Sequence, residues 1–522
     1  MERQAVGRPR FGPSDAARLA SLVTASAATG TIDVRIPFTG ATLGEIPRCG
    51  AADVSVAVRI ARGAQPAWHA LGVRKRSRTL DRFHRLVLRN REQLLDLVQL
   101  ESGKARAHAF EEIVDTALVA RYYARNARRY LKPRRRKGAL PLVTKTIEVR
   151  HPVGVVGFVA PWNFPLILTI TDLLAALAAG NAVVLRPDVQ ASFTALRAVE
   201  LLREAGVPRE VVQVVTGEGA ELGPPLIEQV DFVMFTGSTR TGKIVARQAA
   251  ERLIGYSLEL GGKNPMIVLP DADFEAAVDG AVRGAFVGAG QVCVSVERIF
   301  VPQGAYAAFK AALVERTLGL KLGASFDYSA EVGSLATDRQ LATVESHVAD
   351  ALEKGATLLA GGRRRPELGP WFYEPTILEG VRPGMTAYAE ETFGPVVALY
   401  PYRDVDEAVE RANDTRYGLN ASVWSRSPRR AVKVASRIRC GSVNINEVYA
   451  ATWSSTASPI GGMKESGHGR RHGEEGILKY TEAQTIAVQR ILPLTRPSFL
   501  RPERYEGLMA RLVKLMSFLP GR

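Results

Sequence analysis

Short apolar segments alternate with helical segments along the chain from residue 151 onward. Four runs rich in β-branched residues are predicted to be buried strands, because each is short and is bounded by Gly, Pro, Asn or Asp: 153–159, 182–185, 211–215 and 232–235. Helical patterns occupy 169–179, 191–205 and 241–253. Strands and helices that alternate at this spacing form right-handed crossovers in a parallel, doubly wound sheet. The sequence therefore predicts an α/β fold that binds a ligand beyond the carboxyl ends of its strands.

A second series of the same kind follows residue 261. Expected strands at 266–269, 298–301 and 356–359 alternate with expected helices at 274–288, 306–318 and 343–352. This pattern predicts a second α/β domain, joined to the first through 258–265. A long amphipathic helical region is expected over 77–103. A chain of 522 residues is also too long for a single domain of about 150 residues.

The composition, with 46% hydrophobic and 23% charged residues, is that of a globular protein and excludes a disordered or fibrous chain. The three cysteines, Cys49, Cys293 and Cys440, are too few and too far apart for a disulfide framework, and no Cys or His spacing indicates a metal site. No apolar run approaches the roughly 18 residues of a membrane span, and residues 1–30 lack the apolar core of a signal peptide. We therefore expect a cytoplasmic protein without a bound metal.

The net charge of +16 is concentrated in two segments. Residues 121–150 contain eleven Lys or Arg and one Glu, and residues 490–522 contain seven Lys or Arg and two Glu. The rest of the chain is nearly neutral. A strongly basic balance often marks a nucleic-acid-binding protein, and the run 134–137 is the best candidate for such a surface. The charge distribution argues against this role for the body of the protein.

Three polar residues stand in settings suited to catalysis. Cys293 follows Gly290 and Gln291, and a glycine permits close approach of the backbone to a substrate, although a free cysteine is more often an inert core residue. Glu259 lies between two leucines before a Gly-Gly turn, where an apolar surround raises a carboxyl pKa toward the range of a general base, although it could equally be a surface carboxylate. Asn163 lies in a Pro-Trp-Asn-Phe-Pro turn and could donate a hydrogen bond to an oxyanion or serve only the turn.

The segment 235–243 lies where a strand enters a helix, so its backbone amides can face a pyrophosphate. Residues 237–243 match the first seven positions of a Walker A loop. Ile244 occupies the position at which that loop needs a hydroxyl for Mg²⁺, so a nucleoside triphosphate site is not expected and a dinucleotide remains possible.

Together these segments resemble the aldehyde dehydrogenase superfamily from about residue 30 to 490. The resemblance rests on motifs in order: the Pro-Trp-Asn turn at 161–163, Ala-Gly-Asn-Ala-Val-Val-Leu at 179–185, Phe-Thr-Gly-Ser at 235–238, Glu-Leu-Gly-Gly-Lys-Asn-Pro at 259–265, Gly-Gln-Val-Cys at 290–293, Glu-Thr-Phe-Gly-Pro at 391–395, and Gly-Gly-Met-Lys at 461–464 with Ser-Gly at 466–467. The chain further resembles the NADP-dependent succinate-semialdehyde dehydrogenase group of actinobacterial type.

The resemblance implies a three-part α/β fold. A Rossmann-type dinucleotide-binding domain is expected at 1–131 and 150–261, an α/β catalytic domain at 262–465, and a small β oligomerisation arm at 132–149 and 480–490. Residues 491–522 form a basic, amphipathic tail. The arm implies a homodimer or a dimer of dimers.

The same resemblance implies a role for each matching residue. Cys293 would attack the aldehyde, Asn163 and the Cys293 amide would hold the oxyanion, and Glu259 would activate the water that hydrolyses the thioester. NADP, or alternatively NAD, would contact the following residues: Pro161, Trp162, Arg186, Asp188, Val189, Gly219, Phe235, Thr236, Gly237, Ser238, Gly242, Leu260, Gly261, Glu391 and Phe393.

Two departures from the family pattern affect these expectations. Where the family usually has Lys-Pro-Ser-Glu, this chain has Arg186, Pro187, Asp188 and Val189. Loss of the ribose-binding Glu, together with an Arg for a 2′-phosphate, favours NADP. Asp172 and Arg471 exchange the charges of a Lys and a Glu that meet near the water relay of the family. We therefore expect an ion pair of reversed polarity.

The substrate is less well determined by sequence than the reaction. Better-known succinate-semialdehyde dehydrogenases carry arginines at the positions of Thr171 and Val287. An apolar medium- or long-chain aldehyde is therefore the alternative substrate, with Val287, Ile460 and Trp453 lining an apolar tunnel. Apolar residues at helical spacing in the tail suggest either contact with a membrane or packing on protein. A role as a nucleic-acid-binding protein or an inactive scaffold is disfavoured because the catalytic residues are all present.

Overall fold

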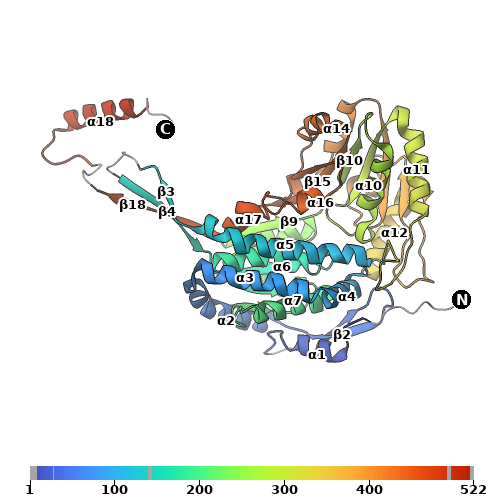
Figure 1. Ribbon diagram of the computed structural model, residues 1–522, viewed down its shortest axis with the longest axis horizontal. Coiled ribbons are helices and arrows are strands. Elements are labelled where there is room, and N and C mark those ends of the chain that lie inside the picture. The colour runs from blue at the N-terminus through green and yellow to red at the C-terminus, as the bar shows by residue number, and fades with distance from the viewer. Residues whose placement is uncertain (1–8, 27–28, 139–143, 491–494, 518–522) are drawn as a thin grey trace. The chain divides into compact units, whose positions relative to one another are not determined.

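The computed structural model describes residues 9–26, 29–138, 144–490 and 495–517 (Figure 1). The chain divides into two compact units. The first comprises Met1–Tyr130 and Pro152–Thr481, and the second comprises Leu131–His151 and Glu482–Arg522. Each unit is described by itself.

A six-stranded sheet of Rossmann type forms the first half of unit 1. Its strand order is β17 (Gly467–His468), β9 (Gly255–Glu259), β8 (Phe232–Thr236), β5 (Val155–Val159), β6 (Ala182–Arg186) and β7 (Val212–Val214). All neighbours are parallel except β17, which pairs antiparallel with β9. The four strands predicted between 153 and 235 are all present within two residues of the expected bounds, and they are the parallel strands β5 to β8.

The helices around this sheet are α6 (Ile167–Ala179), α7 (Ser192–Glu204), α8 (Gly219–Ile227) and α9 (Thr239–Glu251). Three of them were expected from the sequence. The fourth, α8, was not expected, and it contains Pro224 and Pro225, which disfavour a helix interior because they lack an N–H donor. Helices α2 (Ala51–Ala70) and α6 pack against β5 and β6, while α9 packs against β8 and β9.

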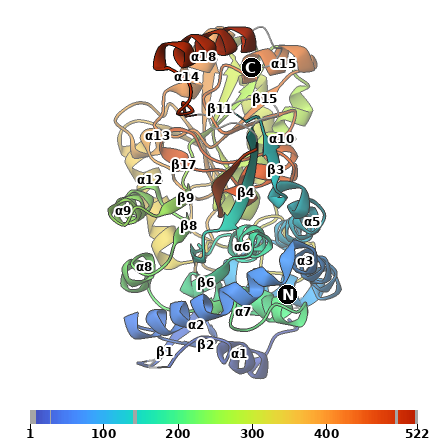
Figure 2. The same ribbon diagram turned by 90° about the vertical axis from the view of Figure 1, so that its left-hand side faces the viewer.

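The N-terminal region adds α1 (Pro13–Ala20), the hairpin β1 (Thr31–Arg35) and β2 (Thr42–Pro47), α3 (Gly72–Arg89), α4 (Arg91–Ser102) and α5 (Arg106–Leu131). The single helical region expected over 77–103 is wrong in one respect, because it is broken into α3 and α4 at Asn90. The Asn90 amide Nδ2 and backbone N–H both donate to the Leu86 carbonyl, which ends α3. Figure 2 shows α1, β1 and β2 at the opposite end of unit 1 from α14 and α15.

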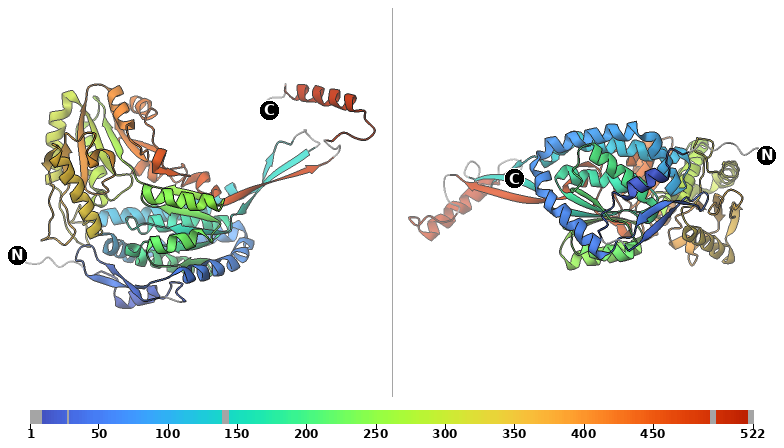
Figure 3. Two further views of the ribbon diagram at one scale, coloured as in Figure 1. Left: turned by 180° about the vertical axis from the view of Figure 1, so that it is seen from behind. Right: turned by 90° about the horizontal axis from the view of Figure 1, so that it is seen from below.

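A seven-stranded sheet forms the second half of unit 1 (Figure 3). Its order is β12 (Thr357–Ala360), β13 (Thr376–Glu379), β14 (Val396–Tyr402), β11 (Val296–Pro302), β10 (Asn264–Val268), β15 (Asn420–Trp424) and β16 (Ser442–Ile445). Only β12 is antiparallel to its neighbour among these described strands. The accompanying helices are α10 (Phe274–Phe286), α11 (Tyr306–Leu318), α12 (Asp338–Glu353), α13 (Thr386–Ala389), α14 (Val405–Asn413), α15 (Pro428–Ala435) and α16 (Ala450–Trp453). Helix α17 (Gly473–Leu478) instead packs against α6.

Unit 2 contains a three-stranded sheet and one helix. The strand order is β18 (Thr481–Gln489), β4 (Thr144–Pro152) and β3 (Arg134–Arg136), and the helix is α18 (Pro502–Met516). Eight of the nine residues of β18 are exposed, and no residue of α18 is buried. Arg136 and Arg150 both pair with Glu148, the one acidic residue in this basic segment. Within the described parts of the chain, no helix is long and apolar enough to cross a membrane.

Candidate active site

Cys293 lies in a tight loop between α10 and β11. A 3-10 turn over Val287–Gly290 precedes it, in which Ala289 and Gly290 adopt positive φ angles of 55° and 71°. A Cβ at Gly290 would lie 2.0 Å from the Gly394 carbonyl oxygen, so the segment 391–395 can approach the loop only because residue 290 is glycine. The thiol itself is half-buried and unbonded to another cysteine.

Two asparagine side chains hold the backbone of this loop. Asn264 Nδ2 donates to the carbonyl oxygens of Cys293 and Ser295 at 2.8 and 2.7 Å. Asn163 Nδ2 donates to the Gln291 carbonyl at 2.9 Å. An amide carries two N–H donors, so Asn163 retains a second one for a ligand. The structure thus brings Asn163 to the cysteine loop across more than a hundred residues of sequence.

A buried ion pair positions the turn that carries Asn163. Lys104 Nζ lies 2.6 Å from Glu112 Oε1 and also donates to the Asn163 carbonyl at 2.8 Å. Glu112 Oε2 accepts the backbone N–H groups of Leu166 and Ile167 at the start of α6. Lys104 and Glu112 are both missing from the sequence-based prediction, because nothing in the local pattern shows that α5 meets this turn.

Glu259 ends strand β9 in a buried position. Its Oε1 has no hydrogen-bonding partner among the described residues, and its side chain is 7% exposed. Burial raises its pKa to about 7, against the opposing effect of Arg471 and Lys479. A carboxyl group that titrates near neutral pH is suited to general base catalysis. The alternative of a surface carboxylate is therefore wrong.

Asp172 lies between two cations. Arg471 Nη2 is 2.7 Å from Asp172 Oδ2, and Lys479 Nζ is 2.9 Å from Oδ1, with all three side chains buried. Burial alone would raise the pKa of Asp172, but the two cations outweigh it and lower the pKa to about 2. The ion pair expected from the sequence thus has a third member, Lys479. Arg471 also donates to Thr171 Oγ1 at 2.9 Å.

Burial raises the pKa of the Cys293 thiol to about 12, and the nearby carboxylates of Glu391 and Glu259 add to this effect. The thiol is therefore protonated at neutral pH and needs a base to become a nucleophile. Glu259, which lines a small cavity together with Cys293 and has a pKa of about 7, is suited to accept that proton.

Three cavities in unit 1 meet at Cys293. A pocket of about 460 Å³ approaches it past Trp162, Ser238 and Glu391, and a pocket of about 170 Å³ approaches it past Phe164 and Trp453. A third cavity of about 20 Å³ is lined by both Cys293 and Glu259, and it is large enough for one water molecule.

Most of the residues expected to bind a coenzyme line the pocket of about 460 Å³: Pro161, Trp162, Thr236, Gly237, Ser238, Leu260, Gly261, Glu391 and Phe393. The N-terminus of α9 opens into this pocket, and Ser238 caps it by accepting the Thr241 N–H. Such a terminus favours an anionic group. A Cβ at Gly261 would lie 2.2 Å from Glu391 Oε2, so the two segments require glycine there.

The other expected coenzyme residues lie elsewhere. Phe235 and Gly242 contact residues of the pocket wall. Phe235 is buried beside Gly237, and a Cβ at Gly242 would lie 2.5 Å from the Leu260 side chain. Arg186, Asp188, Val189 and Gly219 do not line this pocket: Arg186 ends strand β6, Asp188 and Val189 follow it, and Gly219 begins helix α8.

The Arg186 guanidinium donates through Nε and Nη2 to the Gly217 carbonyl, and its Nη1 is 3.8 Å from Asp188 Oδ2. A Cβ at Gly219 would contact the same guanidinium at 3.4 Å.

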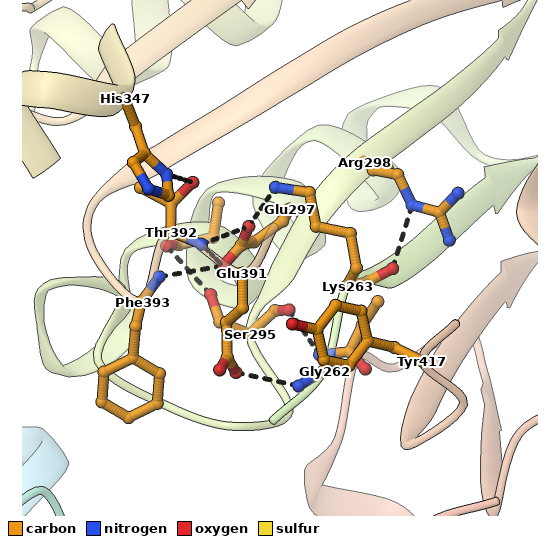
Figure 4. A network of polar contacts seen from close by, with 12 residues as sticks. Gly262, Lys263, Ser295, Glu297, Arg298, His347, Glu391, Thr392, Phe393 and Tyr417 are labelled. Atoms are coloured by element: carbon orange, nitrogen blue, oxygen red, sulfur yellow. Dashed lines mark hydrogen bonds and ion pairs between the residues drawn. The ribbon is translucent and has the colours of Figure 1, made fainter. Parts of the chain in front are cut away.

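The loop of Glu391 and Phe393 is held by a buried ion pair (Figure 4). Lys263 Nζ lies 2.5 Å from Glu297 Oε2, and Glu297 accepts the backbone N–H groups of Thr392 and Phe393 at 3.0 to 3.1 Å. Glu391 itself accepts the Gly262 N–H at 2.8 Å. Burial, followed by the nearby Glu297, raises the pKa of Glu391 to about 8. Glu297 is a further positioning residue that the sequence did not indicate.

One expectation about the substrate tunnel is wrong. Val287 lies on a separate depression beside Arg316 and Tyr328 and does not line the pocket of about 170 Å³. It follows the end of α10 and is 1% exposed. Trp453 lines that pocket as expected, whereas Ile460 lines the water-sized cavity. Among the described residues no group of three or more His, Cys, Asp or Glu side chains could hold a metal ion.

Comparison with known proteins agrees with this geometry. Residues 23–486 match the model of the aldehyde dehydrogenase family. A protein of Mycolicibacterium smegmatis named "Putative succinate-semialdehyde dehydrogenase [NADP(+)]" is 48% identical over 516 residues, which cover 98% of this chain and 100% of the relative.

Two solved structures are similar over most of their length. The first is an NADP-dependent enzyme of E. coli, with a TM-score of 0.84 and 36% identity over 88% of this chain and 95% of the other. The second is betaine aldehyde dehydrogenase of Staphylococcus aureus in complex with NAD+, with a TM-score of 0.86 and 31% identity over 93% of this chain and 99% of the other. By its matched length, its fold and these relatives, the chain belongs to the aldehyde dehydrogenase family.

Proposed function

We propose that this protein oxidises succinate semialdehyde to succinate, with NADP+ as the hydride acceptor. The observation that carries the proposal is the convergence of two pockets and a water-sized cavity on Cys293. This arrangement supplies separate access for an aldehyde, a coenzyme and a hydrolytic water to one nucleophile.

Cys293 is the nucleophile of the proposed reaction. Its thiolate adds to the aldehyde carbon, and Glu259 takes the thiol proton. The developing oxyanion is stabilised by the second N–H of Asn163 and by the Cys293 backbone amide. Loss of hydride from the resulting thiohemiacetal leaves a thioester on Cys293.

Hydrolysis of the thioester uses the small cavity beside Glu259. After the proton taken from the thiol has passed to solvent, Glu259 removes a proton from the water there and the water oxygen attacks the thioester carbon. The C–S bond then breaks, the acid is released, and the departing Cys293 thiolate takes the proton from Glu259. Asp172 keeps Arg471 and Lys479 in place behind Glu259, and so holds the pKa of this base near neutrality.

The residues around the large pocket fit a nicotinamide dinucleotide. The N-terminus of α9 and Arg240 suit its pyrophosphate, while Glu391, Phe393 and Trp162 surround the end nearest Cys293. When bound, the dinucleotide supplies the hydride acceptor. Arg186 and the absence of a carboxylate at Val189 support NADP+, as does the NADP(+) in the name of the mycobacterial relative.

Succinate semialdehyde is supported by the names of the relatives that are 48% identical. The walls of the pocket of about 170 Å³ favour a second candidate, an apolar aldehyde, because Phe110, Val114, Phe164, Leu168 and Trp453 line it. The purified protein should be assayed with succinate semialdehyde, butanal and octanal, each with NAD+ and NADP+. If kcat/KM is at least tenfold higher for octanal than for succinate semialdehyde, the substrate is an apolar aldehyde and the assignment of succinate semialdehyde is wrong.

The arm and the tail are proposed to act in assembly. The exposed strand β18 carries Ile486 and Val488 at 43% and 45% exposure, which suits pairing with another copy as a homodimer or a dimer of dimers. Light scattering of the full chain and of a chain ending at Arg490 tests this, with a monomeric full chain as the contrary result. Vesicles containing anionic lipid would test whether the tail contacts a membrane instead.

A further inference from the structure

The pocket of about 170 Å³ contains a single cationic residue among the described residues that line it. Its walls are mainly aliphatic and aromatic, and its polar side chains are those of Glu111, Asp115, Arg283, Tyr449 and Ser454, besides Cys293 itself. Arg283 is therefore the group in this pocket that can attract an anion.

Arg283 reaches this pocket because of its place on α10. It lies four residues before Val287, which is one helical turn away and on the same side of the helix axis. Val287 lines only the separate depression, whereas the longer side chain of Arg283, which is 47% exposed, lines both that depression and the pocket of about 170 Å³. The Thr171 hydroxyl is unavailable to a substrate, because it donates to the Ile167 carbonyl and accepts from Arg471.

The neighbours of Arg283 hold its guanidinium in position without using all of its hydrogen-bond donors. Glu447 and Glu111 lie 3.2 and 3.6 Å from its nitrogens, longer than the 2.7 to 2.9 Å of a charge-assisted hydrogen bond. Each carboxylate is engaged by other donors: Glu447 accepts two backbone N–H groups, and Glu111 accepts the Tyr449 hydroxyl. The Tyr449 ring supports the guanidinium at 5.2 Å.

We propose that Arg283 binds the carboxylate at the far end of the substrate while the aldehyde carbon lies at Cys293. The inference rests on the proposed function and extends it, since it assigns the residue that selects a dicarboxylic semialdehyde. A planar guanidinium can hold a carboxylate through two parallel N–H donors, and the apolar walls of the pocket strengthen this attraction.

Two of the three neighbouring acidic groups have a pKa above that of an ordinary carboxyl group. Burial raises the pKa of Glu111, and it raises the pKa of Asp115 to about 7, against the effect of Arg471. Asp115 is therefore only partly ionised near neutral pH. Arg283 keeps its full charge, and Glu447 divides its contacts, with Oε1 at 3.2 Å from Arg283 Nη1 and Oε2 accepting the backbone N–H groups of Tyr449 and Ala451.

The test compares the full-length wild type with Arg283→Met, Arg283→Lys and the control Arg430→Met. Arg430 is an exposed arginine on α15, paired with Asp271. We expect Arg283→Met to lower the ratio of kcat/KM for succinate semialdehyde to that for butanal by about tenfold or more, mainly through KM, because a charge-assisted hydrogen bond is lost. Arg283→Lys should recover part of the ratio, and Arg430→Met should leave it as in the wild type.

Product inhibition gives a second, independent readout. The inhibition constant of succinate should rise in Arg283→Met by a similar factor. If the wild type oxidises succinate semialdehyde and the ratio in Arg283→Met changes less than twofold, Arg283 is not the carboxylate site while the proposed function stands. If the wild type oxidises butanal but not succinate semialdehyde, the proposed substrate and this inference both fail.

Discussion

Replacement of Arg471 by Met tests whether the buried cations set the proton affinity of Glu259. Glu259 has a pKa of about 7 because burial raises it while Arg471 and Lys479 lower it. Removing one cation leaves burial less opposed, so the pKa should rise by about one unit, given the typical effect of a nearby opposite charge. At pH 7.5 the ionised fraction of Glu259 would then fall about threefold.

The assay is the pH dependence of kcat for Arg471→Met between pH 6 and 9.5, at saturating aldehyde and coenzyme. We expect kcat to be about threefold lower than in the wild type at pH 7.5 and to approach the wild type above pH 9, because the ionised base is restored. The thiol of Cys293, with its pKa near 12, does not titrate in this range.

Removing the buried anion instead of a buried cation should shift the pKa of Glu259 in the opposite direction. Asp172→Asn removes an anion that raises the pKa of Glu259, so the acid limb of the pH profile of kcat should move to lower pH. Arg437→Met, which removes an exposed arginine paired with Asp406, should leave the profile unchanged. A profile for Arg471→Met that is uniformly depressed, with no shift of the acid limb, would refute the electrostatic reasoning. A double-mutant cycle of Asp172→Asn and Arg471→Met should show coupling.

Further predictions concern the proposed oxyanion donor Asn163, the buried Lys104, Asp115 in the pocket of about 170 Å³, and the choice of coenzyme. Asn163→Ala should lower kcat by about 10² to 10³, measured by steady-state turnover, and near-normal turnover would exclude its role. Lys104→Met should destabilise the fold by about 3 to 5 kcal/mol, seen in chemical unfolding, because it leaves Glu112 buried without its counter-charge. Asp115 becomes charged above pH 7, so KM for succinate semialdehyde should rise from pH 6 to pH 8, and Asp115→Asn should abolish the rise. Val189→Glu should lower the ratio of kcat/KM with NADP+ to kcat/KM with NAD+, and an unchanged ratio would count against the NADP+ assignment.

The sequence alone identifies the fold class and the residues that carry chemistry in contiguous motifs. The predicted strands appear within two residues because short apolar runs bounded by turn residues fit a buried parallel sheet. Cys293, Glu259 and Asn163 stand out because they lie in ordered motifs that resemble the aldehyde dehydrogenase family, whereas the local setting of each one alone leaves a non-catalytic alternative open. The break at Asn90 and the Pro-containing helix α8 escape prediction, because packing overrides weak local preferences there.

Only the tertiary structure decides which distant groups support this machinery. Lys104 meets the turn of Asn163, Glu297 holds the loop of Glu391, and Lys479 joins Asp172 and Arg471. Each contact joins segments far apart in the chain, and each matters because an ion pair buried from water is stable only when its geometry and hydrogen bonds are complete. Sequence thus determines the reactive groups, while the fold determines their proton affinities and the shape of the space around them.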